Sequence, residues 1–465
     1  MSQGIKESGP NIFLITIDAL RYDHLGCYGY HRNTSPNIDA LAGRGVKFTQ
    51  AISNGGHTQT SFPAIMASAL PPLQHAEGKD ILQRSVTLAE VLKKAGYHTA
   101  AFHSNPLLSH FHGYDHGFDL FDDSFRQLRP WRARLLVRGI AKSSGGLIAK
   151  VADKASLALK PIFTHVLTPP IINAEEITRK SLKWHETHNG KIFIWLHYMD
   201  VHHPYMPENE FLSQFYDQPV SRRRMNILWR KMTRKPAEVS QAEREILINL
   251  YDADIKYTDS IIGALLDRLG SQMNNTVVII TADHGDEFGE HGRFGHETLY
   301  DGLLRVPLII AGPGVESGIS INRQVGLINL APTIADIAGI SKPRSFYGKN
   351  LLYLMGEEEK YVTGTVSTIM HPGLGQRSIS YRLPEWKYIC TERINDGCLM
   401  GEEVYNLVDD PGELRNLHKQ DNDEADRFEL EARQKIAQFK QLKAEEKTDY
   451  EKKRIRAKLG KLGKL

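Results

Sequence analysis

Short runs of β-branched and apolar residues alternate along the chain with longer segments of helical periodicity. The runs span Ile12–Ile17, Thr99–His103, Ile192–His197, Val277–Thr281 and Val306–Ile310, and the helical segments include Val86–Ala95, Ala174–His185 and Glu243–Leu269. Apolar strands separated by helices are typical of βαβ units, whose parallel strands are buried on both faces. The sequence therefore predicts an α/β fold with a mostly parallel sheet flanked by helices.

Four of these expected strands run directly into polar side chains. Asp18 follows the first strand, Ser104 and Asn105 follow the second, a cluster from His197 to His203 ends the third, and Asp283 and His284 follow the fourth. Ligands of open α/β sheets bind beyond the carboxyl ends of the strands. We therefore expect these polar residues to meet at one site.

The pattern changes after about residue 340. Tyr361–Val366, Arg377–Tyr381 and Trp386–Cys390 are expected to be strands of a smaller antiparallel sheet, followed by a charged helix from about Asp423 to Arg456. We divide the chain into a catalytic α/β domain (1–340), a small α+β subdomain (341–422) and a charged helical tail (423–465). A basic insert at about 126–171 interrupts the first domain.

The composition of the 465 residues, with 41% hydrophobic and 24% charged, excludes disordered, collagen-like and disulfide-scaffold proteins. The polar N-terminus has no secretion signal, and no run approaches the roughly 20 apolar residues of a membrane span. Three cysteines, Cys27, Cys390 and Cys398, cannot all pair with one another, although the last two could. We therefore expect a cytoplasmic protein.

Three basic stretches contrast with a net charge of only +3. Residues 126–160, 222–235 and 452–464 together contain 23 Lys and Arg residues and one acid, Asp153, so the rest of the chain is acidic. They are either solvated helical faces or surfaces for an anionic membrane, glycan or other polymer. Binding to a membrane would place the protein at its periphery. No nucleic-acid partner is expected.

A Gly-rich segment, TADHGDEFGEHGRFGH (281–296), follows the fourth expected strand. Asp283 and His284 stand side by side in it, and a carboxylate next to an imidazole suits a divalent cation. Asp18, at the end of the first strand, is a candidate third ligand, although it could equally cap the turn that follows it.

A second segment, SNGGHTQTSFPAIMAS (53–68), contains several hydroxyl groups before a helix. Ser61 is a plausible N-cap, and Pro63 suits a first helical turn. Thr58 would then lie in the loop before the helix N-terminus, where free amides favour an alkoxide or an anionic ester. An ordinary capping turn explains the same residues without any chemistry.

The third segment, LHYMDVHHPY (196–205), places His197, Asp200, His202 and His203 at one strand end. A single histidine there could be a buried core residue. Several together favour a general acid or a second metal position.

The order of these segments resembles the sulfatase family of the alkaline phosphatase superfamily. The resemblance begins with NIFLITIDALRYDHLGCYGY and TSPNIDALAGRGVKFTQAIS, continues through HYMDVHHPY, YDADIKYTD, TADHGDEFGEHG and YDGLLRVPLIIAGPG, and ends at EEVYNLVDDPGELRNL. It covers nearly the whole chain apart from the 126–160 stretch and the basic tail. It implies an alkaline-phosphatase-like fold and hydrolysis of sulfuric or phosphoric esters.

The resemblance also implies a role for individual residues. It assigns Asp18, Thr58, Asp283 and His284 to the metal, Thr58 to the nucleophile position, His202 to ester binding and protonation of the leaving group, His296 to a position where many sulfatases have lysine, and Asn105 to substrate contact.

The chain departs from the sulfatase pattern at the nucleophile and at the metal. Sulfatases usually carry C-x-P-x-R, or a serine for the cysteine, which becomes formylglycine, whereas this chain has Thr58-Gln59-Thr60-Ser61-Phe62. Ala19 replaces a second aspartate, and His284 stands where calcium-dependent sulfatases often have asparagine. Among Mn, Zn, Ca and Mg, one nitrogen ligand favours manganese or zinc.

The Asp/Thr/Asp/His set resembles the phosphoesterases and phosphoethanolamine-type transferases of the superfamily, and a second ion could be held by Asp200, His202 and His296. Our hypothesis is a metal-dependent hydrolase in which Thr58 attacks an anionic phosphate or sulfate ester. In it, His202 together with His296 binds the ester and protonates the leaving oxygen. The alternatives are a sulfuric ester hydrolase proper, a transferase of phospho groups acting on a lipid or glycan, and an inactive scaffold or binding protein.

Overall fold

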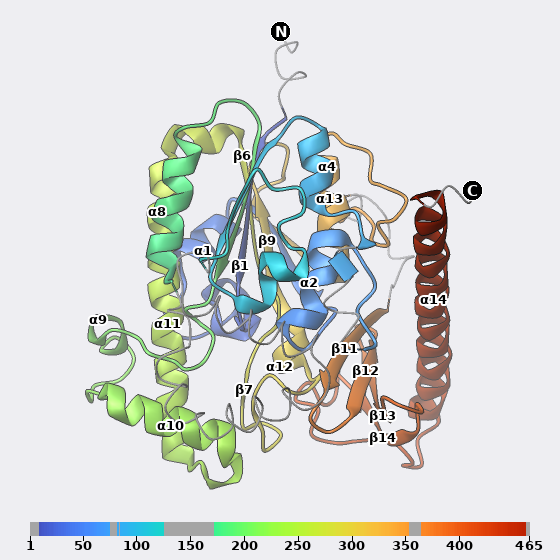
Figure 1. The fold of residues 1–465 in the computed structure, drawn as a ribbon. Helices are drawn as coiled ribbons and strands as arrows, with labels where there is room; N and C mark the ends of the chain where they lie inside the picture. Colours follow the sequence, from blue (N-terminus) through green and yellow to red (C-terminus); the bar gives the residue numbers. More distant parts are fainter. Residues whose placement is uncertain (1–8, 75–80, 83, 125–171, 353–363, 462–465) are drawn as a thin grey trace, which may run out of the picture.

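The computed structural model describes residues 9–74, 81–82, 84–124, 172–352 and 364–461 (Figure 1). Within them lie a central eight-stranded sheet with helices on both faces, a four-stranded C-terminal sheet and a long terminal helix. The central strands are ordered β10-β2-β9-β6-β1-β5-β3-β4. This architecture confirms the predicted α/β fold with a smaller antiparallel sheet and a helix.

Four of the predicted strands, with one short edge strand that the sequence did not predict, form the parallel part of the central sheet. It contains β1 (Asn11–Ile17), β5 (Ile192–Tyr198), β6 (Thr276–Ala282), β3 (His98–His103) and the short β4 (Leu120–Asp122). The first four of these strands are almost wholly buried because helices cover both faces of the sheet, which explains their continuous apolar runs.

The other half of the central sheet differs from the prediction. β9 (Arg305–Ala311) pairs antiparallel with both β6 and β2 (Gly45–Ile52), and β10 (Ile319–Gly326) pairs with β2 at the edge. The sequence did not predict β2 and β10 because polar side chains interrupt both, as expected for strands near an edge that faces solvent.

Helices of the central domain form two layers. One layer contains α1 (Pro36–Ala42), α8 (Ala174–His185) and α11 (Gln241–Leu269), and the other contains α2 (Thr58–Ala67), α4 (Leu88–Lys94) and α13 (Leu330–Ile337) (Figure 1). Capping boxes begin α4 and α11, in which Thr87 pairs with Glu90 and Ser240 with Glu243.

Smaller elements surround the carboxyl end of the sheet. They are α9 (Asn209–Leu212), α10 (Arg222–Arg234), α12 (Asp301–Leu304) and the two-stranded pair β7 (Glu287–Phe288) and β8 (Phe294–Gly295). The basic stretch 222–235 therefore corresponds to α10, whereas residues 126–160 lie outside the described residues.

The C-terminal sheet is antiparallel, with β11 (Thr365–His371), β12 (Gln376–Arg382), β13 (Trp386–Arg393) and β14 (Leu399–Asn406). The first strand was predicted too early, partly in residues outside the described ones, and β14 was not predicted. Helix α14 (Asp423–Lys461) packs Phe428, Ile436 and Phe439 against this sheet. The three cysteines are free thiols, and none of the described helices is long and apolar enough to cross a membrane.

A buried ion network joins the C-terminal sheet to the central domain. Lys387 on β13 is fully buried, and its Nζ contacts Asp301, the Glu413 carboxylate at 2.7 Å and the Leu299 carbonyl at 3.1 Å. Removing one partner of a buried ion pair leaves uncompensated charge in a poorly solvated place.

We therefore expect Lys387→Met to lower the free energy of unfolding by about 3–5 kcal/mol, as measured by urea denaturation. The matched control is Arg393→Met, which removes an exposed ion pair with Asp396 and should cost less than about 1 kcal/mol. Equal losses in the two variants would contradict a structural role for the network.

Candidate active site

The polar residues predicted to meet do lie together at the carboxyl ends of the parallel strands. Asp18 follows β1, Asn105 follows β3, His197 lies near the end of β5, and Asp283 follows β6. Because β1 is hydrogen-bonded to both β5 and β6, and β5 to β3, the ends of all four strands are neighbours. The sheet topology therefore builds the site.

Three potential metal ligands form the centre of this site. Ligand atoms of Asp18, Asp283 and His284 all lie within 4.8 Å of one another, and the three residues are completely buried. The His284 Nδ1 lies 2.8 Å from the Gly285 carbonyl, which can only accept a hydrogen bond. The lone pair of His284 is therefore on Nε2, at 3.6 Å from Asp18 Oδ1 and 3.5 Å from Asp283 Oδ2.

The donor atoms of this group fit a divalent cation. Asp18 Oδ1, both Asp283 carboxylate oxygens and His284 Nε2 are buried without a hydrogen-bond partner. Burial and then the Asp18 charge raise the pKa of Asp283 to about 7, whereas neighbouring histidines outweigh burial and hold the pKa of Asp18 well below its usual range. Buried, unpaired carboxylates are costly unless they are paired or coordinate a metal, so the set suits a cation with oxygen and nitrogen ligands.

Thr58 lies beside this group as the first residue of α2. Its Oγ1 donates toward Asp18 Oδ2 at 3.5 Å. The prediction that Ser61 caps the helix is wrong, because His57 is the N-cap and closes the first turn with Thr60. Thr58 is consequently at the helix N-terminus itself, where free backbone N–H groups and the positive end of the dipole favour negative charge.

Asn105 and His197 hold the Asp18 carboxylate from the other side. Asn105 Nδ2 donates to Asp18 Oδ2 at 2.9 Å, and His197 Nε2 lies 3.2 Å from the same oxygen. Thr16 lies 2.9 Å from the other ring nitrogen of His197. The Asn105 amide, predicted as a substrate contact, thus contacts the carboxylate of a candidate metal ligand. His197 orients the same carboxylate, a role that the sequence did not indicate.

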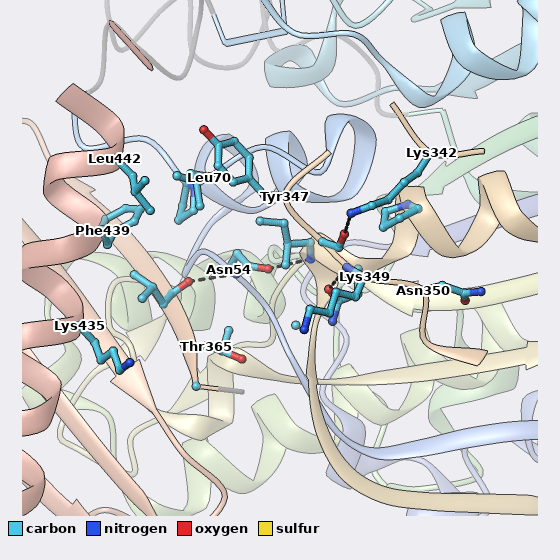
Figure 2. A pocket seen from close by; sticks show the side chains of 18 of the residues that line it. Asn54, Leu70, Lys342, Tyr347, Lys349, Asn350, Thr365, Lys435, Phe439 and Leu442 are labelled. Atoms are coloured by element: carbon cyan, nitrogen blue, oxygen red, sulfur yellow. Dashed lines mark hydrogen bonds between the residues drawn. The ribbon is translucent and has the colours of Figure 1, made fainter. Parts of the chain in front are cut away.

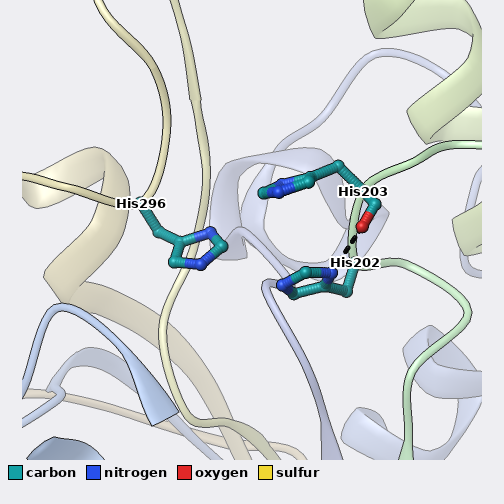
Figure 3. A group of neighbouring side chains, drawn as sticks. All are labelled: His202, His203 and His296. Carbon is teal, nitrogen blue, oxygen red and sulfur yellow. Dashed lines mark hydrogen bonds between the residues drawn. The ribbon is translucent and has the colours of Figure 1, made fainter. Parts of the chain in front are cut away.

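A second group, which we call the histidine group, lies next to Asp18, Asp283 and His284, which we call the metal group. Ligand atoms of His202, His203 and His296 come within 4.8 Å of one another (Figure 3). The His296 ring centre is 4.6 Å from that of His284 and 5.0 Å from that of His202. The His202 Nδ1 lies 2.6 Å from the His203 carbonyl, so its Nε2 is available for another partner.

Asp286 is a buried member of this site that the sequence analysis missed. Its carboxylate accepts a hydrogen bond from the Tyr205 hydroxyl and lies 3.4 Å from Nδ1 of both His203 and His296. Although burial opposes ionisation, the two histidines hold its pKa well below the usual range. The only sequence signal for Asp286 is its position three residues after Asp283 in the segment Asp-His-Gly-Asp. The turn directs the Asp286 side chain to His203 and His296, and a local pattern does not show such contacts.

Asp200 does not join the histidine group. Its carboxylate accepts the Ala174 N–H at 2.9 Å, at the start of α8, and burial raises its pKa to about 7. Among the described residues, Asp200 belongs to none of the groups of side chains that could hold a metal ion. The predicted ligand set of Asp200, His202 and His296 for a second ion is therefore wrong, because sequence neighbours in a turn direct their side chains to different elements.

A cavity of about 930 Å³ lies elsewhere, between α13, the C-terminal sheet and α14 (Figure 2). Asn54 is at its wall and donates to the Val366 carbonyl at 3.0 Å. Neither the metal group nor the histidine group lines this cavity. The candidate active site is therefore located by its potential metal ligands and histidines, and not by this cavity.

A mostly parallel sheet that ends in a buried Asp/Asp/His group beside a helix N-terminus is an arrangement that suits a metal-dependent hydrolase with an alkaline-phosphatase-like fold. Residues 10–340 match the Sulfatase family model, and residues 289–441 match that of the C-terminal region of N-sulphoglucosamine sulphohydrolase. The chain belongs to the sulfatase family, whose members are ester hydrolases.

Relatives by sequence include sulfatases of different kinds. Arylsulfatase K of Danio rerio is 33% identical over 182 residues, 37% of this chain and 33% of that protein, so the match spans about a third of its length. Choline-sulfatase of Rhizobium meliloti (strain 1021) is 25% identical over 454 residues, 91% of this chain and 85% of that protein.

Solved structures share the fold over almost the whole chain. The phosphonate monoester hydrolase of Agrobacterium radiobacter superposes with a TM-score of 0.68 at 18% identity, covering 93% of this chain and 96% of that one. A structure in complex with its substrate D-glucosamine-2-N,6-O-disulfate has a TM-score of 0.66 at 18% identity, covering 96% and 98%.

Proposed function

We propose that this chain hydrolyses phosphate esters with Thr58 as the nucleophile. The observation that carries the proposal is the Thr58 hydroxyl, at the N-terminus of α2 and 3.5 Å from a carboxylate of the Asp18, Asp283 and His284 group. Threonine cannot be oxidised to formylglycine, so it must act through its own oxygen. The His284 nitrogen further favours the phosphoesterase branch of the superfamily.

The metal group and Thr58 would hold one divalent ion, and the nitrogen ligand favours manganese or zinc. Such an ion lowers the pKa of a nearby hydroxyl and neutralises the ester oxygens. The free amides at the start of α2 stabilise the same oxygens.

Two displacements then complete the reaction. The Thr58 hydroxyl gives its proton to Asp283, whose pKa burial raises to about 7, and its oxygen attacks phosphorus while His202 Nε2 protonates the leaving oxygen. In the second step His202 takes a proton from water, the water oxygen attacks phosphorus, and the Thr58 oxygen leaves and recovers a proton. Burial lowers the pKa of free His202 to about 3, but a bound anionic ester favours its charged form.

A general-acid role for His202 predicts a dependence on the leaving group. We expect His202→Gln to lower kcat by about 10²-fold or more for alkyl phosphates, whose leaving oxygen needs a proton. With 4-nitrophenyl phosphate, whose leaving group is stable as an anion, the loss should be much smaller. Steady-state kinetics on both substrates measure this, and equal losses would assign His202 to binding alone.

A sulfate ester hydrolase is the second candidate, because choline-sulfatase is similar over 91% of this chain. Assays of the metal-loaded protein with aryl sulfate, phosphate monoester, phosphodiester and phosphonate substrates test the proposal. Phosphate or phosphodiester turnover exceeding sulfate turnover supports it, and the reverse order refutes it.

Turnover only when a lipid or glycan acceptor is added would indicate a transferase. Two bound ions per chain would extend the metal site to the histidine group.

A further inference from the structure

Residues 53–57 connect β2 to α2 and lead directly into Thr58, so we call this segment the nucleophile loop. Its backbone pairs with β11 of the C-terminal sheet. The Gly56 N–H donates to the Thr368 carbonyl at 3.1 Å, and the Thr368 N–H donates to the Asn54 carbonyl, also at 3.1 Å. Gly55 and Thr368 thereby form a parallel bridge. The C-terminal sheet is therefore hydrogen-bonded to the loop that carries the candidate nucleophile.

The nucleophile loop and β11 approach each other too closely for a side chain at residue 56. A Cβ atom on Gly56 would lie 2.6 Å from the Thr298 carbonyl oxygen and 2.9 Å from Cδ1 of Ile369, which belongs to β11. The Asn54 side chain adds a further bond by donating to the Val366 carbonyl of the same strand at 3.0 Å (Figure 2). The position of the loop is thus fixed from the side of the C-terminal sheet.

Ser53, the first residue of the loop, uses its N–H, its carbonyl and its hydroxyl to contact three other segments. Its N–H donates to the Leu304 carbonyl at 2.7 Å, and its carbonyl accepts the Ser367 hydroxyl of β11 at 2.5 Å. Its own hydroxyl donates to the Asp283 carbonyl. The Gly55 carbonyl lies 2.9 Å from the same hydroxyl oxygen, but the Asp283 carbonyl is the nearer acceptor for its single proton.

Two hydroxyl groups in succession therefore join β11 to the metal group. We call them the serine relay: Ser367 donates to Ser53, and Ser53 donates to Asp283. The accepting carbonyl belongs to the peptide between Asp283 and His284, which are two of the candidate metal ligands. Both serines and both ligands are completely buried, so water is not at hand to replace a lost hydroxyl.

We propose that Ser367 and Ser53 are positioning residues that hold Thr58 and the metal group in register with each other. The C-terminal sheet is then a working part of the active site, although neither serine touches the ester. Residues that orient metal ligands from outside typically change metal affinity or activity by 10- to 100-fold when they are replaced. The inference rests on the proposed function for the role of Thr58, and it adds residues that the reaction itself does not require.

The first experiment measures manganese binding and catalysis in variants of the relay. We expect Ser53→Ala to bind manganese at least about tenfold more weakly in a calorimetric titration, because the Asp283–His284 peptide loses its hydrogen bond. With saturating manganese, Ser367→Ala should lower kcat for 4-nitrophenyl phosphate by about tenfold and change KM less than twofold. The reason is that a shifted loop displaces the attacking oxygen but leaves the residues that bind the ester in place.

The matched control is Ser378→Ala, in the neighbouring strand β12. Its hydroxyl is also buried and shares a hydrogen bond with Thr391 Oγ1 at 2.8 Å, within the C-terminal sheet. This variant should lower the unfolding temperature about as much as Ser367→Ala does, while manganese affinity and kcat change less than twofold. A similar loss of stability without the functional loss separates positioning from folding.

The proposal would be overturned by manganese affinity within twofold of the unmodified protein in Ser53→Ala, or by kcat within twofold in Ser367→Ala. Losses of the same size in Ser378→Ala would overturn it as well. The titration also separates the relay from the proposed function. Retained hydrolysis in Thr58→Ala refutes the nucleophile, whereas weaker manganese binding in Ser53→Ala is measured without any turnover.

Discussion

Replacing Thr58 by alanine is expected to lower kcat for phosphate ester hydrolysis by at least about 10³-fold. The reason is that the variant lacks the oxygen that forms the covalent bond, while the helix N-terminus and the metal group remain. The Thr58 side chain is small and buried, and within the described part of the chain its hydroxyl bonds to a side chain, Asp18, and not to the backbone. Folding should therefore stay close to that of the unmodified protein, as circular dichroism would show. Elemental analysis should still find metal, because Asp18, Asp283 and His284 remain to hold it.

Two further variants make the Thr58 test specific. Thr58→Ser keeps a hydroxyl at the same place and should retain measurable turnover. Ser61→Ala removes a hydroxyl one helical turn away and should change kcat less than tenfold, because among the described residues that hydroxyl bonds only to the Thr58 carbonyl, at 3.3 Å. Activity that survives in Thr58→Ala but is lost in Ser61→Ala would transfer the nucleophile to Ser61.

Removing the metal is expected to abolish turnover and also to destabilise the fold. Asp18 Oδ1, both Asp283 carboxylate oxygens and His284 Nε2 have no hydrogen-bond partner, so a chelator leaves these buried atoms without a ligand. A ligand present at about 1,000 times its dissociation constant stabilises a protein by about 4 kcal/mol. Thermal unfolding with and without chelator should show a stabilisation of that order, which manganese or zinc restores.

The variant Asp283→Asn separates the metal from the rest of the site. It removes one of the two facing carboxylates, so the chelated variant should be more stable than the chelated unmodified protein. The variant should also bind the metal ion at least about tenfold more weakly than the unmodified protein does, as measured by calorimetric titration. If the unmodified protein and the variant, each with and without chelator, all had the same unfolding temperature, this group would hold no ion.

Local sequence patterns were sufficient to predict those strands and helices whose own residues determine their secondary structure. The five strands and the helices α8 and α11 were predicted within about two residues, because continuous apolar runs and capping residues define them. Strands β2, β10 and β14 were missed, since about half of their side chains are polar. The partners of β2 and β10 are also distant in sequence, so no local pattern indicates their pairing. The antiparallel direction of β9 was missed for the same reason.

The sequence by itself determined the class of fold, the family and the residue types around the ester, because strand ends, turns and the Asp-His pair are local patterns. Only the tertiary structure decided which side chains act together. It turned Asp200 toward α8 and placed Asp286 between two histidines. It also put Thr58 rather than Ser61 at the start of α2. The direction of a side chain after a strand depends on contacts with other elements, and no local pattern encodes those contacts.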